Sequence, residues 1–562
     1  MKVLIIGGVA TGPKVAARLR RLRPEAEITI VEQGTSVSYG ACGLPLYLAN
    51  LVPQIDELTM TSYGLVRDEE FFANHKGINV LTGTRAIQID RQNKVVRTKN
   101  LSTGAEEDLN YDYLVLATGA KPVVPKIPGV ELKNVFTLNN PGDAQSIKKY
   151  IQENKIKHLT IVGAGLIGIE TADALAGPRL KVSICESASH VLPKMFDPDI
   201  AKLFERKLRS RGVDVRLGCK VVSLEGCEQV KKVILEQGQI ETEMVIFTTG
   251  VRPEVGLAQA AGLEIGNTGA IKVDSQMMTN DPFIYAGGDC AEQTHLLTGK
   301  QVYIPLASTA NKQGRVIADN IAGLSSAFPG VSGTSVLQAF EFNMGRTGLG
   351  EEEAKALGYD VICSISSGLD STHFYPMHSS ITVKLLAERA TGKVLGVQIC
   401  GLGEAIKRVD VVAAVLKFGG TLEDLSNIDL GYAPPFSTAI DVLIHAANTL
   451  DNKRKGIIKG ITAQELYKEL CNGAEICILD VREEEEFEAN PVKGEAVIKV
   501  PIGELRARVA KLSKECKFDK FVTVCELGIR GYEAACLLKS AGYDVRYLEG
   551  GMSVWSAYQS EA

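Results

Sequence analysis

The sequence predicts an α/β protein in which two doubly wound domains precede an α+β domain and a smaller C-terminal α/β domain. Two segments, 2–31 and 158–186, each have the pattern of a strand, a glycine turn, a helix and a second strand. The region 331–447 mixes strand and helix signals without such a turn. A polar and charged stretch at 448–459 is expected to be a linker, and a compact α/β pattern follows it at 460–562.

Composition and charge exclude several classes of protein. The chain has 562 residues, enough for about three to five domains, and it is 45% hydrophobic and 23% charged, as soluble globular proteins are. A net charge of −5 offers no basic field for nucleic acid, and no apolar run reaches the roughly 18 residues of a membrane span. Glycines follow the first strand too soon for a signal peptide. We expect a cytoplasmic protein that neither binds nucleic acid nor inserts into membranes.

The cysteines suggest sulfur chemistry at two positions. All 12 are scattered along the chain, without the paired short spacings of zinc sites or disulfide scaffolds. In a reducing cytoplasm, most are expected to be buried apolar side chains. Cys42 and Cys525 have unusual neighbours and are the exceptions.

The second glycine turn predicts a dinucleotide site. Gly163, Gly165 and Gly168 lie between a strand and a helix, and Glu186 ends the next strand. Such glycines permit a tight turn and close approach of a pyrophosphate to the helix N-terminus. A carboxylate at Glu186 can accept a hydrogen bond from a ribose 2′-hydroxyl and would repel a 2′-phosphate. The turn therefore predicts binding of NADH in preference to NADPH.

The first glycine turn departs from this pattern because its middle glycine is shifted. Gly7, Gly8 and Gly12 form the turn, and Val9 stands where the middle glycine is usual. Taken alone the turn is weak evidence for a nucleotide. Glu32, at the end of the following strand, supplies the ribose-binding acid that the pattern requires.

Two later segments fit the same ligand. One strand ends in Thr118 and Gly119, and another is followed by a turn that carries Asp289. With these motifs the chain resembles, over residues 1–447, the two-dinucleotide-binding flavoproteins, the pyridine nucleotide–disulfide oxidoreductases with the glutathione-reductase-like fold. The resemblance implies bound FAD, NADH as cosubstrate, and FAD contacts from Gly7, Gly8, Gly12, Glu32, Thr118, Gly119 and Asp289.

The resemblance also implies domain boundaries. The FAD-binding domain would comprise 1–115 and 250–328, and the NADH-binding domain 116–249. Residues 329–447 would form a dimerisation domain, which implies a homodimer.

Cys42 lies in a segment rich in small residues that begins at Ser38, a candidate substrate contact. Family members that use a dithiol carry a second cysteine five residues later, where this chain has Tyr47. A single thiol can still react if a positive environment or an electron-poor cofactor favours its thiolate. The segment resembles the single-cysteine branch of the family. Its Cys-Gly-Leu-Pro run is more similar to coenzyme A disulfide and persulfide reductases than to NADH oxidases and peroxidases.

A basic helix near the N-terminus is the candidate site for the phosphates of coenzyme A. Arg18 and Arg21, about one turn apart, are the preferred pair among several cations. The alternative is an ordinary solvated helix face.

Two tyrosines of the third region are candidate proton donors. The resemblance implies that tyrosines of the dimerisation domain reach the partner's thiol site, and Tyr432 matches its motif. The second position usually has two adjacent tyrosines, of which this chain keeps Tyr375 and replaces the first by Phe374. The alternative for both tyrosines is aromatic packing at the dimer interface.

The C-terminal region predicts a second reactive sulfur. Cys525 ends a strand and begins a six-residue loop that enters a helix, so backbone N–H groups should face its sulfur and favour an anion. This pattern resembles a rhodanese domain, in which Cys525 would carry a persulfide. Arg530 could stabilise that anion or be a solvated helix-start cation, and Glu526 should disfavour the dianion thiosulfate. The glutamates at 483–486 are expected to be a solvated helix start.

Together these features predict an FAD-dependent NADH oxidoreductase. It would reduce coenzyme A persulfide, polysulfide or coenzyme A disulfide through Cys42, while the rhodanese-like domain handles sulfane sulfur. The alternatives are an NADH oxidase or peroxidase that uses a cysteine sulfenic acid, and a redox-sensing sulfur-carrier protein. The expected partners are small-molecule persulfides, disulfides or polysulfides and a second copy of the chain, with coenzyme A as a further ligand.

Overall fold

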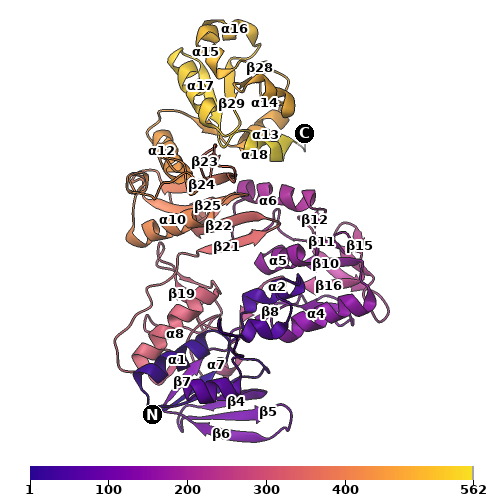
Figure 1. The fold of residues 1–562 in the computed structure, drawn as a ribbon, viewed down its shortest axis with the longest axis vertical. Coiled ribbons are helices and arrows are strands. Elements are labelled where there is room, and N and C mark those ends of the chain that lie inside the picture. The colour runs from indigo at the N-terminus through magenta and orange to yellow at the C-terminus, as the bar shows by residue number, and fades with distance from the viewer. Residues whose placement is uncertain (560–562) are drawn as a thin grey trace. The chain divides into compact units, whose positions relative to one another are not determined.

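The computed structural model describes residues 1–559 and divides them into two compact units (Figure 1). The first unit consists of Met1–Ser187 and Gly212–Val331, and the second of Ala188–Arg211 and the chain from Ser332 onward. Within the described residues, no helix combines the length and apolar character needed to cross a bilayer.

The first sheet of the first unit is parallel and has the topology expected of a doubly wound domain. Helix α1 (Thr11–Leu22) connects its first two strands and buries Val15, Ala16 and Leu19 against the sheet. Helix α8 (Ala307–Ile321) packs beside α1. In the order of pairing the strands are β18 (Ile284–Ala286), β7 (Tyr113–Leu116), β1 (Lys2–Ile6), β2 (Glu27–Val31) and β3 (Asn79–Leu81).

A second parallel sheet in the same unit repeats this design around helix α5 (Leu166–Leu175). Its strands are β12 (Asp214–Arg216), β11 (Lys181–Cys185), β10 (His158–Val162), β16 (Met244–Phe247) and β9 (Val135–Thr137). Both predicted strand–turn–helix–strand segments are confirmed.

Shorter elements complete the first unit. Its small sheets are β4–β5–β6 (Thr84–Asp90, Val95–Asn100, Glu106–Asn110), β13–β14–β15 (Val221–Glu225, Lys232–Leu235, Gln239–Glu241), β17–β8 (Val251–Pro253, Ala120–Pro122) and β19–β20 (Gln293–Thr294, Gln301–Val302). Its other helices are η1 (Ala41–Gly43), α2 (Leu44–Leu48), η2 (Ile55–Thr59), α3 (Glu69–Phe71), η3 (Phe72–Lys76), α4 (Pro141–Asn154) and α7 (Gly256–Ala260).

From Ser332 onward the second unit has an antiparallel sheet with accompanying helices, in agreement with the α+β domain predicted for this region. Its strands pair in the order β21 (Ser335–Ala339), β22 (Phe342–Gly348), β25 (Val394–Gly401), β24 (Ser380–Glu388) and β23 (Val361–Leu369). The accompanying helices are α9 (Glu351–Ala356), α10 (Ile406–Phe418), α11 (Leu422–Ser426) and α12 (Val442–Arg454).

Helix α6 (Pro198–Ser210) packs with this antiparallel sheet, although the sequence predicted 116–249 to be one nucleotide-binding domain. The cause is a buried charge cluster: Nζ of Lys384 lies 3.0 Å from Asp197, 2.7 Å from Asp199 and 2.8 Å from Glu351. Burial alone would lower the pKa of Lys384, but the surrounding carboxylates raise it well above its usual value. Sequence patterns within one segment do not reveal such a long-range pair.

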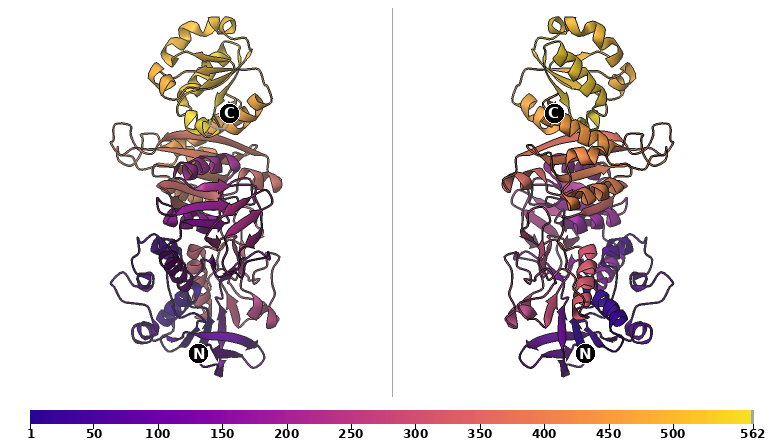
Figure 2. Two further views of the ribbon diagram at one scale, coloured as in Figure 1. Left: turned by 90° about the vertical axis from the view of Figure 1, so that its right-hand side faces the viewer. Right: turned by 90° about the vertical axis from the view of Figure 1, so that its left-hand side faces the viewer.

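The C-terminal domain has a parallel sheet, and Figure 2 shows helices on both sides of it. The strands pair in the order β26 (Gly460–Ile461), β30 (Asp544–Leu548), β29 (Lys520–Val524), β27 (Ile476–Asp480) and β28 (Val497–Lys499). The helices are α13 (Ala463–Cys471), α14 (Glu484–Ala489), α15 (Ile502–Arg508), η4 (Val509–Lys511), α16 (Leu512–Glu515), α17 (Ile529–Ser540) and α18 (Met552–Gln559).

The predicted linker 448–459 is wrong over more than half its length. Helix α12 continues to Arg454 and buries Leu450, so only 455–459 joins the helix to the next strand without regular structure. The polar composition of this stretch suggested a solvated linker. In the structure, however, the ammonium group of Lys453 forms an ion pair with the buried carboxylate of Glu549.

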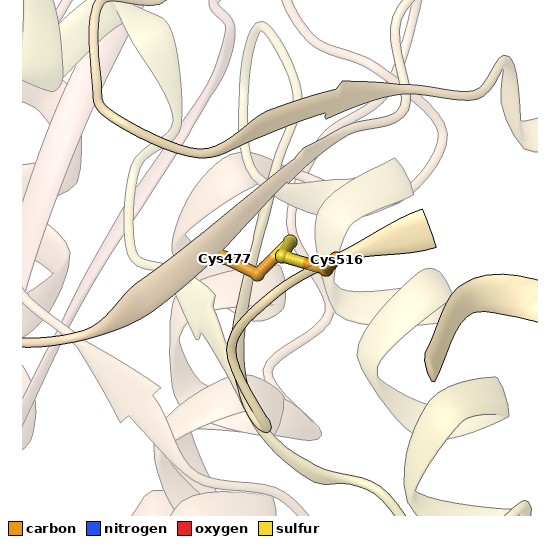
Figure 3. The surroundings of a disulfide bond; sticks show 2 residues. All are labelled: Cys477 and Cys516. Carbon is orange, nitrogen blue, oxygen red and sulfur yellow. A yellow bond between two sulfur atoms is a disulfide. The ribbon is translucent and has the colours of Figure 1, made fainter. Parts of the chain in front are cut away.

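Two cysteines that were expected to be unpaired form a disulfide. Cys477 on β27 and Cys516 after α16 are joined, as Figure 3 shows, with 6.4 Å between their Cα atoms. They are 39 residues apart. The fold brings them together, and no short spacing in the sequence indicated the bond.

Replacement of Lys384 by Met should destabilise the second unit by about 3–5 kcal/mol, because three carboxylates would lose their shared cation. Urea unfolding followed by circular dichroism measures the loss. Lys355→Met is the matched control, since Lys355 pairs with the same Glu351 while 57% exposed and should cost less than about 1 kcal/mol. Equal losses in the two variants would contradict the role of the buried cluster.

Candidate active sites

The first glycine turn connects β1 to α1, and at two of its positions only glycine fits. Gly7 has φ +110°, and a Cβ there would lie 2.0 Å from the carbonyl oxygen of Ala117. A Cβ on Gly12 would lie 1.9 Å from the Gly7 carbonyl oxygen. The carboxylate of Glu32 accepts hydrogen bonds of 2.7 Å from the backbone N–H of both Gly8 and Gly34. The turn and its acid therefore form one site at the carboxyl end of the sheet.

Asp289 and its neighbours lie at the same edge, after β18. The pKa of Asp289 is raised by burial. The backbone N–H of Gly288 donates to Oε1 of Gln313 at 2.8 Å, while Nε2 of this fully buried Gln313 has no hydrogen-bond partner among the described residues. A buried amide nitrogen without an acceptor and a turn that only glycine fits are what a bound, oxygen-rich cofactor requires.

Thr118 and Gly119 end the strand between these two segments. The hydroxyl of Thr118 donates to the carbonyl of Glu254 at 2.7 Å, and Gly119 has φ +71°. The predicted FAD contacts thus follow β18, β7, β1 and β2, which are successive neighbours in one sheet. The residues present fit FAD.

The second glycine turn repeats the first. A Cβ on Gly163 (φ +109°) would lie 2.6 Å from the Thr248 carbonyl oxygen, and one on Gly168 would lie 2.1 Å from the Gly163 carbonyl oxygen. Gly165, at the start of α5, has open space where its Cβ would be. The carboxylate of Glu186 accepts from the backbone N–H of Ala164 at 2.8 Å. This arrangement fits a dinucleotide whose ribose contacts Glu186.

Cys42 lies in the short helix η1, and the segment before it is hydrogen-bonded to the first glycine turn. The backbone N–H of Ser38 (φ +53°) donates to the carbonyl of Gly8 at 2.7 Å and fixes this segment to the turn. Although Cys42 as a residue is exposed, the pKa of its thiol is raised, first by desolvation of the sulfur and then by the carboxylates of Glu170 and Asp289. The polypeptide by itself therefore favours the neutral thiol. A thiolate at Cys42 needs positive or electron-poor groups from a bound ligand.

Sequence reasoning missed two residues beside this segment. Glu170 on α5 has a pKa of about 7, raised by burial and by Asp173, so it can exchange a proton near neutral pH. Nζ of Lys148 donates to the carbonyl of Tyr47 at 3.0 Å and lies 3.8 Å from the centroid of its ring. The apolar residues before Glu170 gave a signal of burial, whereas nothing in the sequence indicated the contact of Lys148.

The two arginines of the proposed phosphate site have different surroundings. Arg18 donates to the carboxylate of buried Asp319 at 2.8 Å, so its charge is already matched. Arg21 is exposed in the last turn of α1. Use of Arg18 as a phosphate ligand would require its ion pair to break.

The two tyrosines lie in the second unit. Tyr432 is 53% exposed in the segment between α11 and α12, and Tyr375 is half-buried in the loop after β23. Phe374, Met377 and Phe436 are each at least 65% exposed. So much exposed apolar surface in one domain indicates a region that another surface covers.

Cys525 directly follows β29 and is 2% exposed, and its sulfur accepts a 3.1 Å hydrogen bond from the backbone N–H of Gly528. Burial raises the pKa of this thiol, while the N–H groups of Gly531, Gly528 and Leu527 and the charge of Arg530 act in the opposite direction. Backbone donors therefore face this sulfur, as the loop predicted.

The charged residues around Cys525 are paired. Arg530 donates to both oxygens of Glu486, at 2.7 and 2.6 Å, so it is not a fully solvated cation and Glu486 is not a fully solvated acid. Arg482 is completely buried and pairs with Asp480 at 2.8 Å and with Glu526 at 3.3 Å. Glu526 is still 43% exposed, so it presents negative charge at the mouth of the loop.

Known protein families match successive parts of the chain. Residues 1–314 match the pyridine nucleotide-disulphide oxidoreductase family, residues 336–444 its dimerisation domain, and residues 462–558 the rhodanese-like domain. The chain is similar to the NAD(P)H coenzyme A polysulfide/persulfide reductase of Pyrococcus horikoshii, with 38% identity over 80% of this chain and 98% of that protein.

Two solved structures extend the similarity to the C-terminal domain. One is a NAD-dependent persulfide reductase from A. fulgidus, with 42% identity and a TM-score of 0.94 over 99% of this chain and all of that one. The other is the reduced Bacillus anthracis protein CoADR-RHD, with 34% identity and a TM-score of 0.91 over 100% of this chain and 98% of that one.

Replacement of Glu186 by Gln should lower the ratio of kcat/KM for NADH to that for NADPH by about tenfold. The variant loses a charge-assisted bond to the ribose, worth roughly 1.5 kcal/mol, and no longer repels a 2′-phosphate. Steady-state kinetics with the two nucleotides measures the ratio. Glu236→Gln, an exposed acid of the same unit, is the control, and an unchanged ratio in Glu186→Gln would remove Glu186 from the ribose site.

Proposed function

The chain belongs to the pyridine nucleotide-disulphide oxidoreductase family, and from this premise we propose that it reduces the sulfur–sulfur bond of a small thiol persulfide or disulfide with electrons from NADH. The chain is a flavoprotein oxidoreductase. Coenzyme A persulfide, polysulfide and coenzyme A disulfide are the substrates we propose. An enzyme that draws on NADH and coenzyme A thiols would act where both are abundant, and we propose a cytoplasmic location on that ground.

One observation carries this function: the position five residues after Cys42 holds Tyr47, and Lys148 binds its carbonyl and lies against its ring. The reactive segment thus offers one sulfur where a dithiol enzyme offers two. A single thiol can accept two electrons only after it has formed a bond to another atom. We therefore propose that the second sulfur comes from the substrate.

The reaction balances as follows. The Cys42 sulfur attacks the inner sulfur of a persulfide RS–SH, forms a mixed disulfide with RS, and releases hydrosulfide. FAD, when bound, supplies the two-electron transfer from NADH to this disulfide. Two electrons and one proton then return the Cys42 thiolate and the free thiol RSH. A disulfide RS–SR reacts in the same way and releases a thiolate in the first step.

The leaving thiolate needs a proton donor, and Glu170, whose pKa is about 7, is an acid of this unit that also raises the pKa of Cys42. Tyr432 and Tyr375 are further proposed donors in a homodimer. The exposed apolar residues Phe374, Met377 and Phe436 support such a dimer, because a second copy of the domain would cover them. Arg21 and Ser38 remain proposed contacts for coenzyme A.

The C-terminal domain is proposed to carry sulfane sulfur on Cys525. A persulfide on Cys525 would be an anion that the N–H group of Gly528 can face. This sulfur could be passed to a thiol such as coenzyme A, which would then become a substrate for Cys42.

Replacement of Cys42 by Ser should lower anaerobic, persulfide-dependent NADH oxidation by about three orders of magnitude or more while FAD stays bound. Stopped-flow absorbance with coenzyme A persulfide, coenzyme A disulfide, polysulfide and peroxide, compared side by side, measures the rates. Cys227→Ser is the control, because Cys227 is another exposed cysteine of the first unit. A wild-type rate in Cys42→Ser would exclude the mechanism, and a preference of the wild-type enzyme for peroxide would favour the sulfenic acid alternative.

Replacement of Glu526 by Gln should raise kcat/KM for thiosulfate:cyanide sulfur transfer by up to about tenfold, because it removes a negative charge facing a dianionic donor. Cyanide-dependent thiocyanate formation measures the reaction, and the variant Cys525→Ser, which lacks the reactive thiol, gives the background rate. Glu485→Gln changes an exposed acid of the same domain and should have no effect. An unchanged rate for thiosulfate would mean that Glu526 does not select against dianions.

A further inference from the structure

The loop that begins at Cys525 is in backbone contact with a glycine turn near the end of the chain. The backbone N–H of Met552 donates to the carbonyl of Cys525 at 2.9 Å. A Cβ on Gly551 (φ +64°) would lie 2.4 Å from that carbonyl oxygen and 2.7 Å from the backbone nitrogen of Gly528. Because the turn is hydrogen-bonded to the loop and packs too closely against it for a Cβ at Gly551, we expect a displacement of the turn to move the N–H group of Gly528 that faces the Cys525 sulfur.

The turn follows Glu549, whose carboxylate is completely buried. One of its oxygens lies 2.6 Å from Nζ of Lys453 on α12, and the other accepts from the backbone N–H of Ile365 at 3.0 Å. Lys453 also donates to the carbonyl of Cys363 at 2.9 Å. Cys363 and Ile365 are two residues apart on β23, the edge strand of the antiparallel sheet. The ion pair therefore supplies hydrogen-bond partners for the carbonyl of Cys363 and the N–H group of Ile365, which lie on the open edge of the sheet.

The packing around this pair leaves it little freedom. A Cβ on Gly460 would lie 2.0 Å from Oε1 of Glu549, so only glycine fits beside the carboxylate. The side chain of Ile365 belongs to the same hydrophobic cluster as Val522 and Trp555 of the C-terminal domain. The edge of the antiparallel sheet is thus part of the packing that supports the Cys525 loop.

Electrostatics makes the two charges interdependent. Burial lowers the pKa of Lys453, while Glu549 and other acidic groups raise it, with a net rise. Removal of one charge leaves the other buried without compensation, which is far less favourable than removal of both.

We propose that Lys453 and Glu549 are positioning residues for Cys525: the pair fixes the turn at 550–551 to the edge strand β23, and the turn sets the backbone donors around the reactive sulfur. Lys453 lies in the segment whose composition suggested a linker. The assignment depends on the proposed role of Cys525 as the sulfur carrier. The geometry of the loop can nevertheless be tested without any sulfur donor.

The test is the rate of alkylation of Cys525 by iodoacetamide in the full-length protein, followed by peptide mass spectrometry from pH 6 to about 10. Besides backbone N–H groups, the charge that faces this sulfur is Arg530, which every variant retains. Lys453→Met should slow alkylation at pH 8 by about tenfold, the loss that a rise of about one pKa unit in the thiol produces. The double variant Lys453→Met/Glu549→Gln should recover most of the rate, because no unpaired charge remains and an amide oxygen can still accept from Ile365.

The control is Lys455→Met, which removes a lysine from the same helix end, where Lys455 is exposed and pairs with Asp451. Its profile should equal that of the wild type, and NADH oxidation through Cys42 should be unchanged in all variants. An unaltered profile in Lys453→Met, or a double variant as slow as the single one, would overturn the proposal. Faster alkylation with the pKa of a free cysteine, about 8.5, would also overturn it, because the pair would then only keep the domain folded.

Persulfide loading of the wild-type protein separates this inference from the proposed function. A wild-type Cys525 that never carries a persulfide would refute its role as sulfur carrier. The alkylation profiles would still decide whether Lys453 and Glu549 set the loop.

Discussion

Four glycines that have no room for a Cβ determine what the first unit can bind. At Gly7, Gly12, Gly163 and Gly168 an added carbon would lie 1.9–2.6 Å from a backbone carbonyl oxygen. The chain can therefore enter α1 and α5 only through these tight turns. In each turn a backbone N–H group, that of Gly8 or Ala164, binds the carboxylate that follows the next strand. The position of Cys42 depends on the same constraint, because the backbone of Ser38 is bonded to Gly8.

The two reactive cysteines receive different support from the protein. Around Cys525 the polypeptide supplies N–H donors and a cation, which partly offset the cost of burial. Around Cys42 it supplies carboxylates, which add to that cost. Groups of the polypeptide itself thus help to stabilise the anionic form of the Cys525 sulfur. The anionic form of the Cys42 sulfur depends on the ligands that bind beside it.

Features set by neighbouring residues were predictable from the sequence, whereas features set by distant contacts were not. The strands and helices around both glycine turns, the acids Glu32 and Glu186, and the loop at Cys525 lie as their local patterns indicated. From the sequence, Arg18 was expected to be free to bind a phosphate. Its ion-pair partner, Asp319, lies 301 residues away and could not be recognised from the local pattern. The Cys477–Cys516 bond and the helical course of 448–454 were missed for the same reason. Each depends on a partner that only the folded chain brings near.

The buried Lys384 cluster limits where this chain could be cut into fragments that fold by themselves. Helix α6 lies in the sequence between strands of the second parallel sheet, yet Asp197 and Asp199 at its start pair with Lys384 on β24, which belongs to the antiparallel sheet. A fragment that stopped at Val331 would keep both glycine turns but leave these acids without their counterion. The smallest reductase that could be excised from this protein would therefore have to include the antiparallel sheet. The C-terminal domain also packs on α6, where Arg206 donates to the hydroxyl of Ser556 on α18 at 2.7 Å, so its removal would uncover the helix that carries these acids.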